Sequence, residues 1–139
     1  MTTIAKDLLS NNPESIKKVE WILRIAIFGT YLGHGVLALQ LKPSFLELIE
    51  GMSGITGTLA ENLLYTIGVI DIMTAILAIV YPFRLLLIWA TLWGFLTAVA
   101  RPVSGEPVWD FIERWANWGA PLALLYLRNL PMSLKGLFR

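Results

Sequence analysis

The sequence predicts an all-α fold, a four-helix transmembrane bundle with both termini in the cytoplasm. Its 139 residues are 56% hydrophobic and 15% charged, whereas an average soluble domain is about 45–50% apolar and about 25% charged. Mean hydropathy is +0.65. Four apolar segments approach the ~20 residues that a helix needs to cross ~30 Å of hydrocarbon.

The predicted spans lie within a single domain, 1–139, and cover about 21–41, 62–81, 84–100 and 108–127. Only helices or closed barrels satisfy their backbone in lipid, and these segments are too long and evenly apolar for barrel strands. Residues 1–20 are polar and lack the apolar core of a signal peptide, so we expect the first span to be retained as an anchor.

The connections agree with four spans. Within 42–61, "PSFLELIEGM" (43–52) predicts a short amphipathic helix at the membrane interface. "YPFR" is a tight connection, and Pro107 in "RPVSGEP" suits the first turn of the fourth helix. "RNLP" ends that helix.

Basic residues set the expected orientation, because cytoplasmic loops carry an excess of Lys and Arg. One side carries three of them, Lys42, Arg101 and Arg114. The other side, which also carries both termini, has seven: Lys6, Lys17, Lys18, Arg84, Arg128, Lys135 and Arg139. Arg24, just inside the first span, is expected to extend toward the seven-charge side.

Polar residues are expected to meet in the outer half of the bundle. Glu106, Asp110, Glu113 and Asn117 are spaced 4, 3 and 4 apart, which places them on one helical face. Charges at membrane depth are costly and should face the interior and pair with one another. The candidate ligand-binding residues are His34, Asp71, Trp93, Arg101, Glu113, Arg114, Asn117 and Trp118.

Simpler roles compete with ligand binding. Acidic residues in a first helical turn favour the helix dipole, and Trp near a membrane boundary is commonly an anchor. Asp71 could make a polar contact between helices. Trp93, Thr97 and Arg101 share one stripe of the third helix, where Trp side chains could line a flat apolar pocket for a quinone or a lipid tail.

His34 is the single histidine of the chain. Gly29 and Gly33 before it form a G-x-x-x-G pattern that permits close helix packing, so His34 could simply bridge that contact. It could instead polarise a ligand, or serve as a haem axial ligand. Haem is disfavoured because one histidine supplies only one axial bond.

Several classes of function are excluded or disfavoured. Without cysteine, the chain forms no disulfide, zinc-thiolate site or iron–sulfur cluster. The net charge of +1 gives no reason to expect nucleic acid as a partner. Sequence motifs for dinucleotide, phosphate, zinc-protease or serine-hydrolase sites are absent, so no catalytic residue or metal site is assigned.

Three stretches resemble the DoxX-like family of small four-helix bacterial membrane proteins. They are Arg24, "FGTYLGHG" (28–35) and "ENLLYTIGVIDI" (61–72), whereas Ala100–Leu125 does not match the family pattern. The resemblance implies a multi-pass protein of the bacterial inner membrane, tied to quinone-linked systems such as thiosulfate:quinone oxidoreductase. It transfers His34 and Arg24 as candidate functional residues.

The expected function is therefore binding of a quinone or another lipid-like ligand, in association with a membrane oxidoreductase. Any redox chemistry would come from a cofactor, because none of these side chains carries electrons by itself. One alternative is an accessory or scaffold subunit of a larger complex without its own ligand. Another is a small proton-coupled carrier that uses Asp71 and His34. Besides the bilayer, a protein partner or a second copy of the chain is expected.

Overall fold

The computed structural model describes residues 12–139, and these residues form helices and connecting turns without a strand. Residues 1–11, which hold Lys6 and much of the predicted polar segment 1–20, lie outside the described part. In chain order the helices are α2 (Pro13–Leu39), α3 (Pro43–Ser53), α4 (Gly57–Val80), α5 (Arg84–Val103), α6 (Val108–Ile112), α7 (Trp115–Leu127) and the 3₁₀ helix η1 (Leu134–Phe138).

Three of these helices, α2, α4 and α5, are long and apolar enough to cross a membrane. They correspond to the first three predicted spans: α2 and α4 begin before the predicted spans and end one or two residues short of them, and α5 runs three residues further. α2 begins at Pro13, where the Asn12 side chain accepts a hydrogen bond of 3.2 Å from the Ser15 backbone N–H. The apolar pattern marks the stretch suited to hydrocarbon, whereas a helix runs on to its capping residues.

The fourth predicted helix, 108–127, is not continuous, which corrects the sequence-based prediction. Arg114 interrupts it: its Nη1 donates to the Asp110 carbonyl at 2.6 Å, and its backbone N–H bonds the Phe111 carbonyl at 3.2 Å. This i→i+3 bond tightens the chain into a turn between α6 and α7. α7 has 13 residues, which gives about 20 Å at 1.5 Å per residue and is too short to span the hydrocarbon alone.

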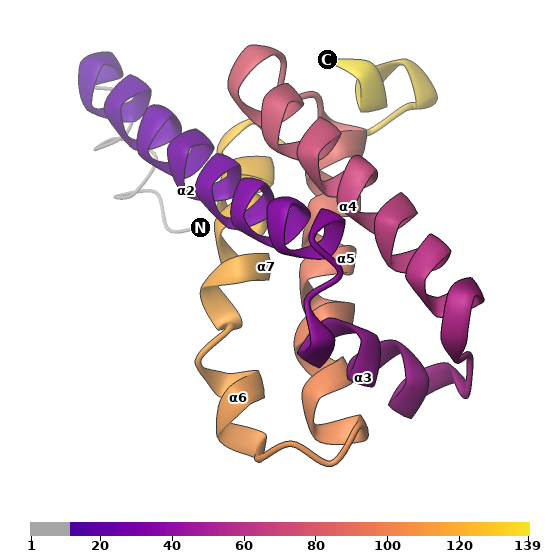
Figure 1. Cartoon of the computed structure of the whole chain (residues 1–139). Coiled ribbons are helices and arrows are strands. Elements are labelled where there is room, and N and C mark those ends of the chain that lie inside the picture. The colour runs from indigo at the N-terminus through magenta and orange to yellow at the C-terminus, as the bar shows by residue number, and fades with distance from the viewer. Residues whose placement is uncertain (1–11) are drawn as a thin grey trace.

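The helices form an elongated bundle (Figure 1). α2 crosses α4 and also contacts α7, while α6 and α7 follow α5 back along its length. The short helix α3 packs against both α4 and α5. The core lies between α2, α4, α5 and α7, and its buried side chains are Ile27, Tyr31, Ala75, Ala78, Leu87, Ala90, Leu124 and Leu125.

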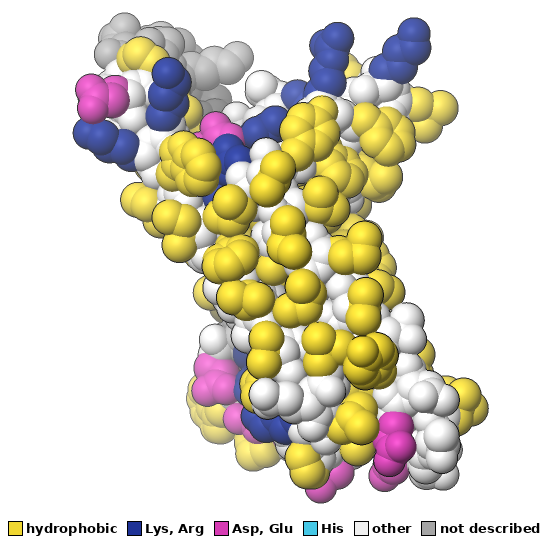
Figure 2. All heavy atoms as spheres, turned by 45° about the horizontal axis from the view of Figure 1, so that its top comes forward, with side chains coloured by type: hydrophobic (Ala, Val, Ile, Leu, Met, Phe, Trp, Pro, Cys, Tyr) yellow, Lys and Arg dark blue, Asp and Glu magenta, His cyan; other side chains and the backbone are white. Residues whose placement is uncertain are grey.

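The outer surface is suited to lipid contact. Figure 2 shows a broad band of hydrophobic side chains between two polar ends, with most of the visible Lys and Arg at the end that carries the C-terminus. Large exposed side chains such as Ile22, Val80 and Leu92 contribute to the apolar surface. A soluble monomer rarely exposes so extensive an apolar patch, so the surface agrees with the three helices of membrane-spanning length.

α2 and α4 pack tightly against each other at Gly35 and Gly68. A Cβ atom built on Gly35 would lie 3.0 Å from the Gly68 carbonyl oxygen, and one on Gly68 would lie 3.0 Å from the Gly35 carbonyl oxygen. At Gly29 and Gly33, a Cβ atom would meet no atom of the described residues within 4 Å. Within the bundle, α2 therefore packs closely on α4 through Gly35, which lies nearer to the C-terminal end of α2 than the G-x-x-x-G pair does.

Two arginines satisfy carbonyl groups at helix ends. Arg24 donates from Nε to the Ala78 carbonyl at 3.2 Å and from Nη2 to the Ile79 carbonyl, which caps the C-terminus of α4. Arg84 donates to the carbonyls of Arg128, Asn129 and Gly136 at 2.6–3.2 Å, and so holds the C-terminal segment against α5.

Candidate functional site

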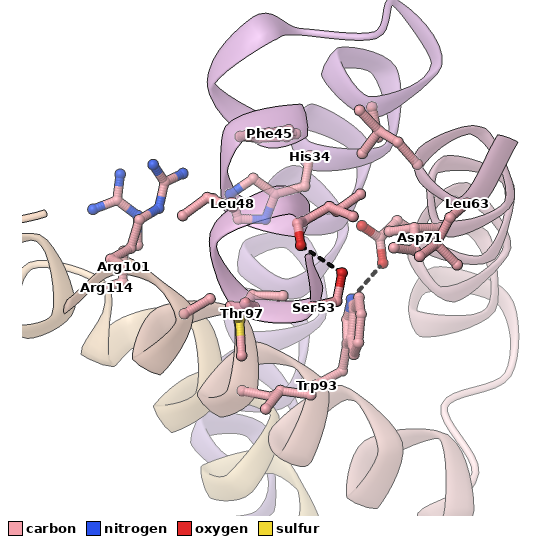
Figure 3. A pocket seen from close by; sticks show the side chains of 17 residues that line it. His34, Phe45, Leu48, Ser53, Leu63, Asp71, Trp93, Thr97, Arg101 and Arg114 are labelled. Carbon is pink, nitrogen blue, oxygen red and sulfur yellow. Dashed lines mark hydrogen bonds between the residues drawn. The ribbon is translucent and has the colours of Figure 1, made fainter. Parts of the chain in front are cut away.

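A cavity of about 220 Å³ lies where α2, α3, α4 and α5 meet (Figure 3). An apolar cavity of roughly 150 Å³ is large enough to bind benzene, so this one has room for at least one ring or part of an acyl chain. Its apolar lining residues are Ala38, Phe45, Leu48, Ile49, Met52, Leu63, Leu64, Ile67, Leu96 and Ala100.

The cavity reaches the surface of the bundle. Met52 of α3, Leu63 of α4 and Leu96 of α5 line it and are all partly exposed. Because these side chains belong to the apolar outer surface, an apolar part of a ligand could extend between them without leaving an apolar environment.

One side of the cavity carries an acid joined to an aromatic ring. Asp71 of α4 is only 4% exposed, and its Oδ1 accepts a hydrogen bond of 3.0 Å from the indole Nε1 of Trp93 on α5. Trp89 stacks on Trp93 with ring centroids 5.4 Å apart. The Trp93 bond stabilises a carboxyl group that would otherwise be costly to bury, and it holds one edge of the indole against the cavity.

The opposite side is basic. Arg101 and Arg114 lie together at this end, and the His34 ring extends toward them (Figure 3). Phe45 of α3 lies among the cations: its ring centroid is 5.7 Å from the Arg101 Cζ atom and 5.2 Å from the Lys42 Nζ atom. The His34 ring meets the Phe45 ring edge-on at 6.0 Å. The cavity thus has a basic pole and an acidic pole with apolar walls between them.

Arg101 is the most deeply buried of the basic side chains at this pole, with 9% of its surface exposed. Its Nη1 donates to both carboxylate oxygens of Glu106, at 2.9 and 3.1 Å. Its Nε is buried without a hydrogen-bond partner among the described residues. The guanidinium group therefore retains donor capacity after its ion pair has formed.

The structure brings five of the eight candidate ligand-binding residues to one cavity: His34, Asp71, Trp93, Arg101 and Arg114. The stripe of Trp93, Thr97 and Arg101 on α5 faces it as a unit. Because one histidine and one carboxylate face a common space across the bundle, the cavity offers a ligand polar contacts on two sides.

The other three candidates do not line the cavity. The Glu113 carboxylate pairs with Arg114 at 2.5 Å, and its side chain is largely exposed. The backbone of Asn117 faces Gly94, where it would lie 2.9 Å from an added Cβ atom. Trp118 packs edge-on against Phe95 at 5.7 Å. Asn117 and Trp118 therefore support the contact between α5 and α7 instead of the cavity wall, whereas Glu113 pairs with Arg114.

No match is found. Neither protein-family models nor curated proteins nor solved structures give a significant similarity to this chain. The resemblance to DoxX-like proteins therefore stays a prediction. Of the two residues that it transfers, Arg24 caps α4 away from the cavity, whereas His34 lines it.

The contribution of α3 was missed by sequence reasoning. The segment "PSFLELIEGM" does form a helix, yet its apolar side chains turn inward and form one wall of the cavity. The signal was present, since Phe45, Leu48, Ile49 and Met52 follow the i, i+3, i+4, i+7 spacing of a buried helical face. These side chains line the cavity inside the protein, whereas the sequence-based expectation was that they lie at the membrane interface.

Within residues 12–139, no group of three or more His, Cys, Asp or Glu side chains is placed to hold a metal ion. The polar groups that face the cavity are instead hydrogen-bond donors, one carboxyl group and one imidazole. Such a set is suited to orienting the polar part of an organic ligand.

Proposed function

We propose that this chain is a multi-pass protein of the bacterial inner membrane that binds a quinone or another lipid-like ligand in the cavity between α2, α3, α4 and α5. The observation that carries the proposal is an apolar cavity with polar side chains at two opposite poles. In this role the protein would present or store the ligand for a membrane oxidoreductase.

The layout of the cavity suits a flat ring with oxygen atoms at opposite edges. His34 and Arg101 can donate to an oxygen at the basic pole, while the Asp71 carboxyl group faces the other side. Trp93 and Phe45 supply aromatic surfaces near the two poles, and aromatic pairs in offset or edge-on geometry stabilise one another. The partly exposed rim leaves a path for an isoprenoid or acyl tail.

The same proposal includes a fourth crossing and the orientation. α6 and α7 in series run beside α5, and together with their connecting turn they cover 108–127, about the length that a span requires. With four crossings both ends of the chain lie on one side. The excess of Lys and Arg at that side supports a cytoplasmic location.

Ligand binding can be tested with purified protein in maltoside detergent and decylubiquinone as the probe. We expect saturable quenching of tryptophan fluorescence, because Trp93 lines the cavity. His34→Ala should weaken the quinone affinity several-fold. Trp93→Phe should remove much of the quenching, whereas Trp109→Phe, at a side chain that is 71% exposed, should not.

Absence of saturable quenching, together with an unchanged signal in His34→Ala, would reject a quinone as the ligand of this cavity. Equal loss of quenching in Trp93→Phe and Trp109→Phe would indicate partitioning of the quinone into the micelle. That result would equally count against a specific site.

The second candidate is a scaffold subunit of a larger complex. It is favoured by the G-x-x-x-G face of α2, because Gly29 and Gly33 contact nothing within 4 Å of an added Cβ atom and such faces pack against other helices in membranes. A partner in fixed stoichiometry after purification in mild detergent, lost in Gly29→Leu, would favour this candidate.

A further inference from the structure

At the basic pole of the cavity, the positively charged side chains outnumber the carboxylates that pair with them. Arg101 pairs with Glu106, and Arg114 pairs with Glu113. Lys42, with its Nζ above the same Phe45 ring, forms no ion pair among the described residues. The pole therefore carries one uncompensated cation beside two arginines that already have partners.

Arg101 shows a second, independent feature. Only its Nη1 takes part in hydrogen bonds within the described residues, and its Nε is buried without a partner. A buried donor that loses water without gaining a partner costs about 1–3 kcal/mol, and more when it is charged. In native structures such a group calls for an explanation, and an absent ligand is one.

We propose that the polar end of the ligand is an oxyanion, a carboxylate or phosphate group on a single-chain amphiphile, bound by the Nε and Nη2 side of Arg101. The inference rests on the proposed function, since it needs the cavity to hold a lipid-like molecule. It narrows that function from neutral quinones to acidic amphiphiles.

The geometry of the guanidinium group explains the preference. Nε and Nη2 lie in one plane and can donate two parallel hydrogen bonds to two oxygens of a carboxylate or phosphate. A hydroxyl or carbonyl group offers one neutral oxygen, so it gains neither the second parallel hydrogen bond nor the attraction between opposite charges. The acid should therefore bind more tightly than an uncharged molecule of equal chain length.

The apolar walls of the cavity are suited to the acyl chain of the ligand. Besides Arg101, the lining includes Leu48 and Ile67, together with Leu63 and Leu96, which are partly exposed. An acyl chain among these side chains stays in apolar surroundings, and each buried CH₂ group adds about 0.8 kcal/mol of favourable transfer. A free anion would gain only the contacts at the basic pole.

The test compares four probes on the full-length protein in maltoside detergent: dodecanoate, dodecyl phosphate, dodecanol and inorganic phosphate. Binding is measured as the concentration-dependent rise in Tm, because a ligand that binds only the folded state raises it. Decylubiquinone is titrated on the same sample. We expect the two acidic amphiphiles to bind about tenfold or more tightly than dodecanol, and inorganic phosphate to have little effect.

Variants assign the difference to Arg101. Arg101→Gln keeps a planar polar side chain and should remove about tenfold of the affinity for dodecanoate while leaving dodecanol unchanged. Glu106→Gln removes a nearby negative charge and weakens the hold on Nη1, so it should strengthen dodecanoate binding. Lys18→Gln, an exposed change in α2 far from the cavity, should alter neither.

The outcomes separate the two proposals. Equal binding of dodecanoate and dodecanol, or binding of decylubiquinone alone, would overturn the acidic head group while the proposed function stands. Stabilisation by inorganic phosphate equal to that by dodecyl phosphate would also overturn it, because the site would then take a free anion. Failure of every amphiphile and of the quinone would reject the proposed function itself. If Arg101→Gln does not fold, the comparison of acid with alcohol on the unchanged protein and the Glu106→Gln result still decide.

Discussion

The indole of Trp93 and the carboxyl group of Asp71 join α5 to α4 through a single hydrogen bond of 3.0 Å. It is the one hydrogen bond between side chains of these two helices in the described part of the chain. Because Asp71 is almost fully buried, this bond both fixes the cavity wall and satisfies a polar group that has lost most of its contact with water.

Removing the indole donor should destabilise the fold. Trp93→Phe keeps an aromatic ring but leaves Asp71 without its donor, at an expected cost of about 1–3 kcal/mol in the free energy of unfolding. The measurement is thermal or denaturant unfolding in detergent. Trp109→Phe is the control and should change stability by less than about 0.5 kcal/mol.

A double-mutant cycle tests the pairing itself. Trp93→Phe and Asp71→Leu should be clearly non-additive, because either change alone leaves the other group unpaired. Additive effects would show that the hydrogen bond contributes nothing to stability.

The glycine contact between α2 and α4 predicts a clear contrast. Gly35→Ala and Gly68→Ala place a methyl group about 3.0 Å from a backbone carbonyl oxygen, and overpacking of this kind typically costs about 1–3 kcal/mol. Gly29→Ala and Gly33→Ala meet open space and should be neutral or slightly stabilising, since Ala favours helix over Gly.

Unfolding in detergent measures all four glycine variants. The pattern would be contradicted if Gly29→Ala and Gly33→Ala proved as harmful as the other two. A fall in oligomer mass in those variants would then indicate a partner helix on that face of α2.

Arg24 is expected to act in stability and not in ligand binding. Arg24→Leu removes two hydrogen bonds to the carbonyls that end α4, with an expected loss of about 1.5–3 kcal/mol because the donor is charged. Arg24→Lys should recover only part of it, since Lys cannot reproduce the planar fork. An Arg24→Leu protein that is fully stable but no longer binds ligand would contradict this role.

Arg84 should control access to the C-terminal segment. Arg84→Gln shortens the side chain that reaches three carbonyls in residues 128–136, so trypsin should cleave after Lys135 markedly faster. Mass spectrometry of timed digests measures the rate, and Lys18→Gln serves as the control. An unchanged cleavage rate would mean that contacts such as Phe83 with Phe138 suffice.

The long apolar helices could be predicted because their signal is local. α2, α4 and α5 each present enough consecutive apolar residues to cross a membrane, and this property requires no knowledge of neighbouring helices. The bend in the fourth segment could not be predicted, because it depends on one guanidinium group bonding the Asp110 carbonyl in place of solvent. The spacing of apolar residues carries no information about this hydrogen bond, so it does not predict the bend.

The same bend explains which candidates missed the cavity. The 4, 3, 4 spacing from Glu106 to Asn117 defines one face only if the helix is continuous. The turn at Arg114 breaks the angular relation, so Arg114 points to the cavity while Asn117 faces Gly94. On α5, which is continuous, Trp93, Thr97 and Arg101 stayed on one face as their spacing predicts.

Because α3 supplies a wall of the cavity, the structure predicts how many ligands each polypeptide binds. Helices α2, α3, α4 and α5 of a single chain are enough to form the cavity, and α3 supplies one of its walls. A saturated sample would therefore carry one ligand per polypeptide, whether the protein is a monomer, a dimer or part of a larger complex. Dilution that dissociates an assembly would leave this ratio unchanged.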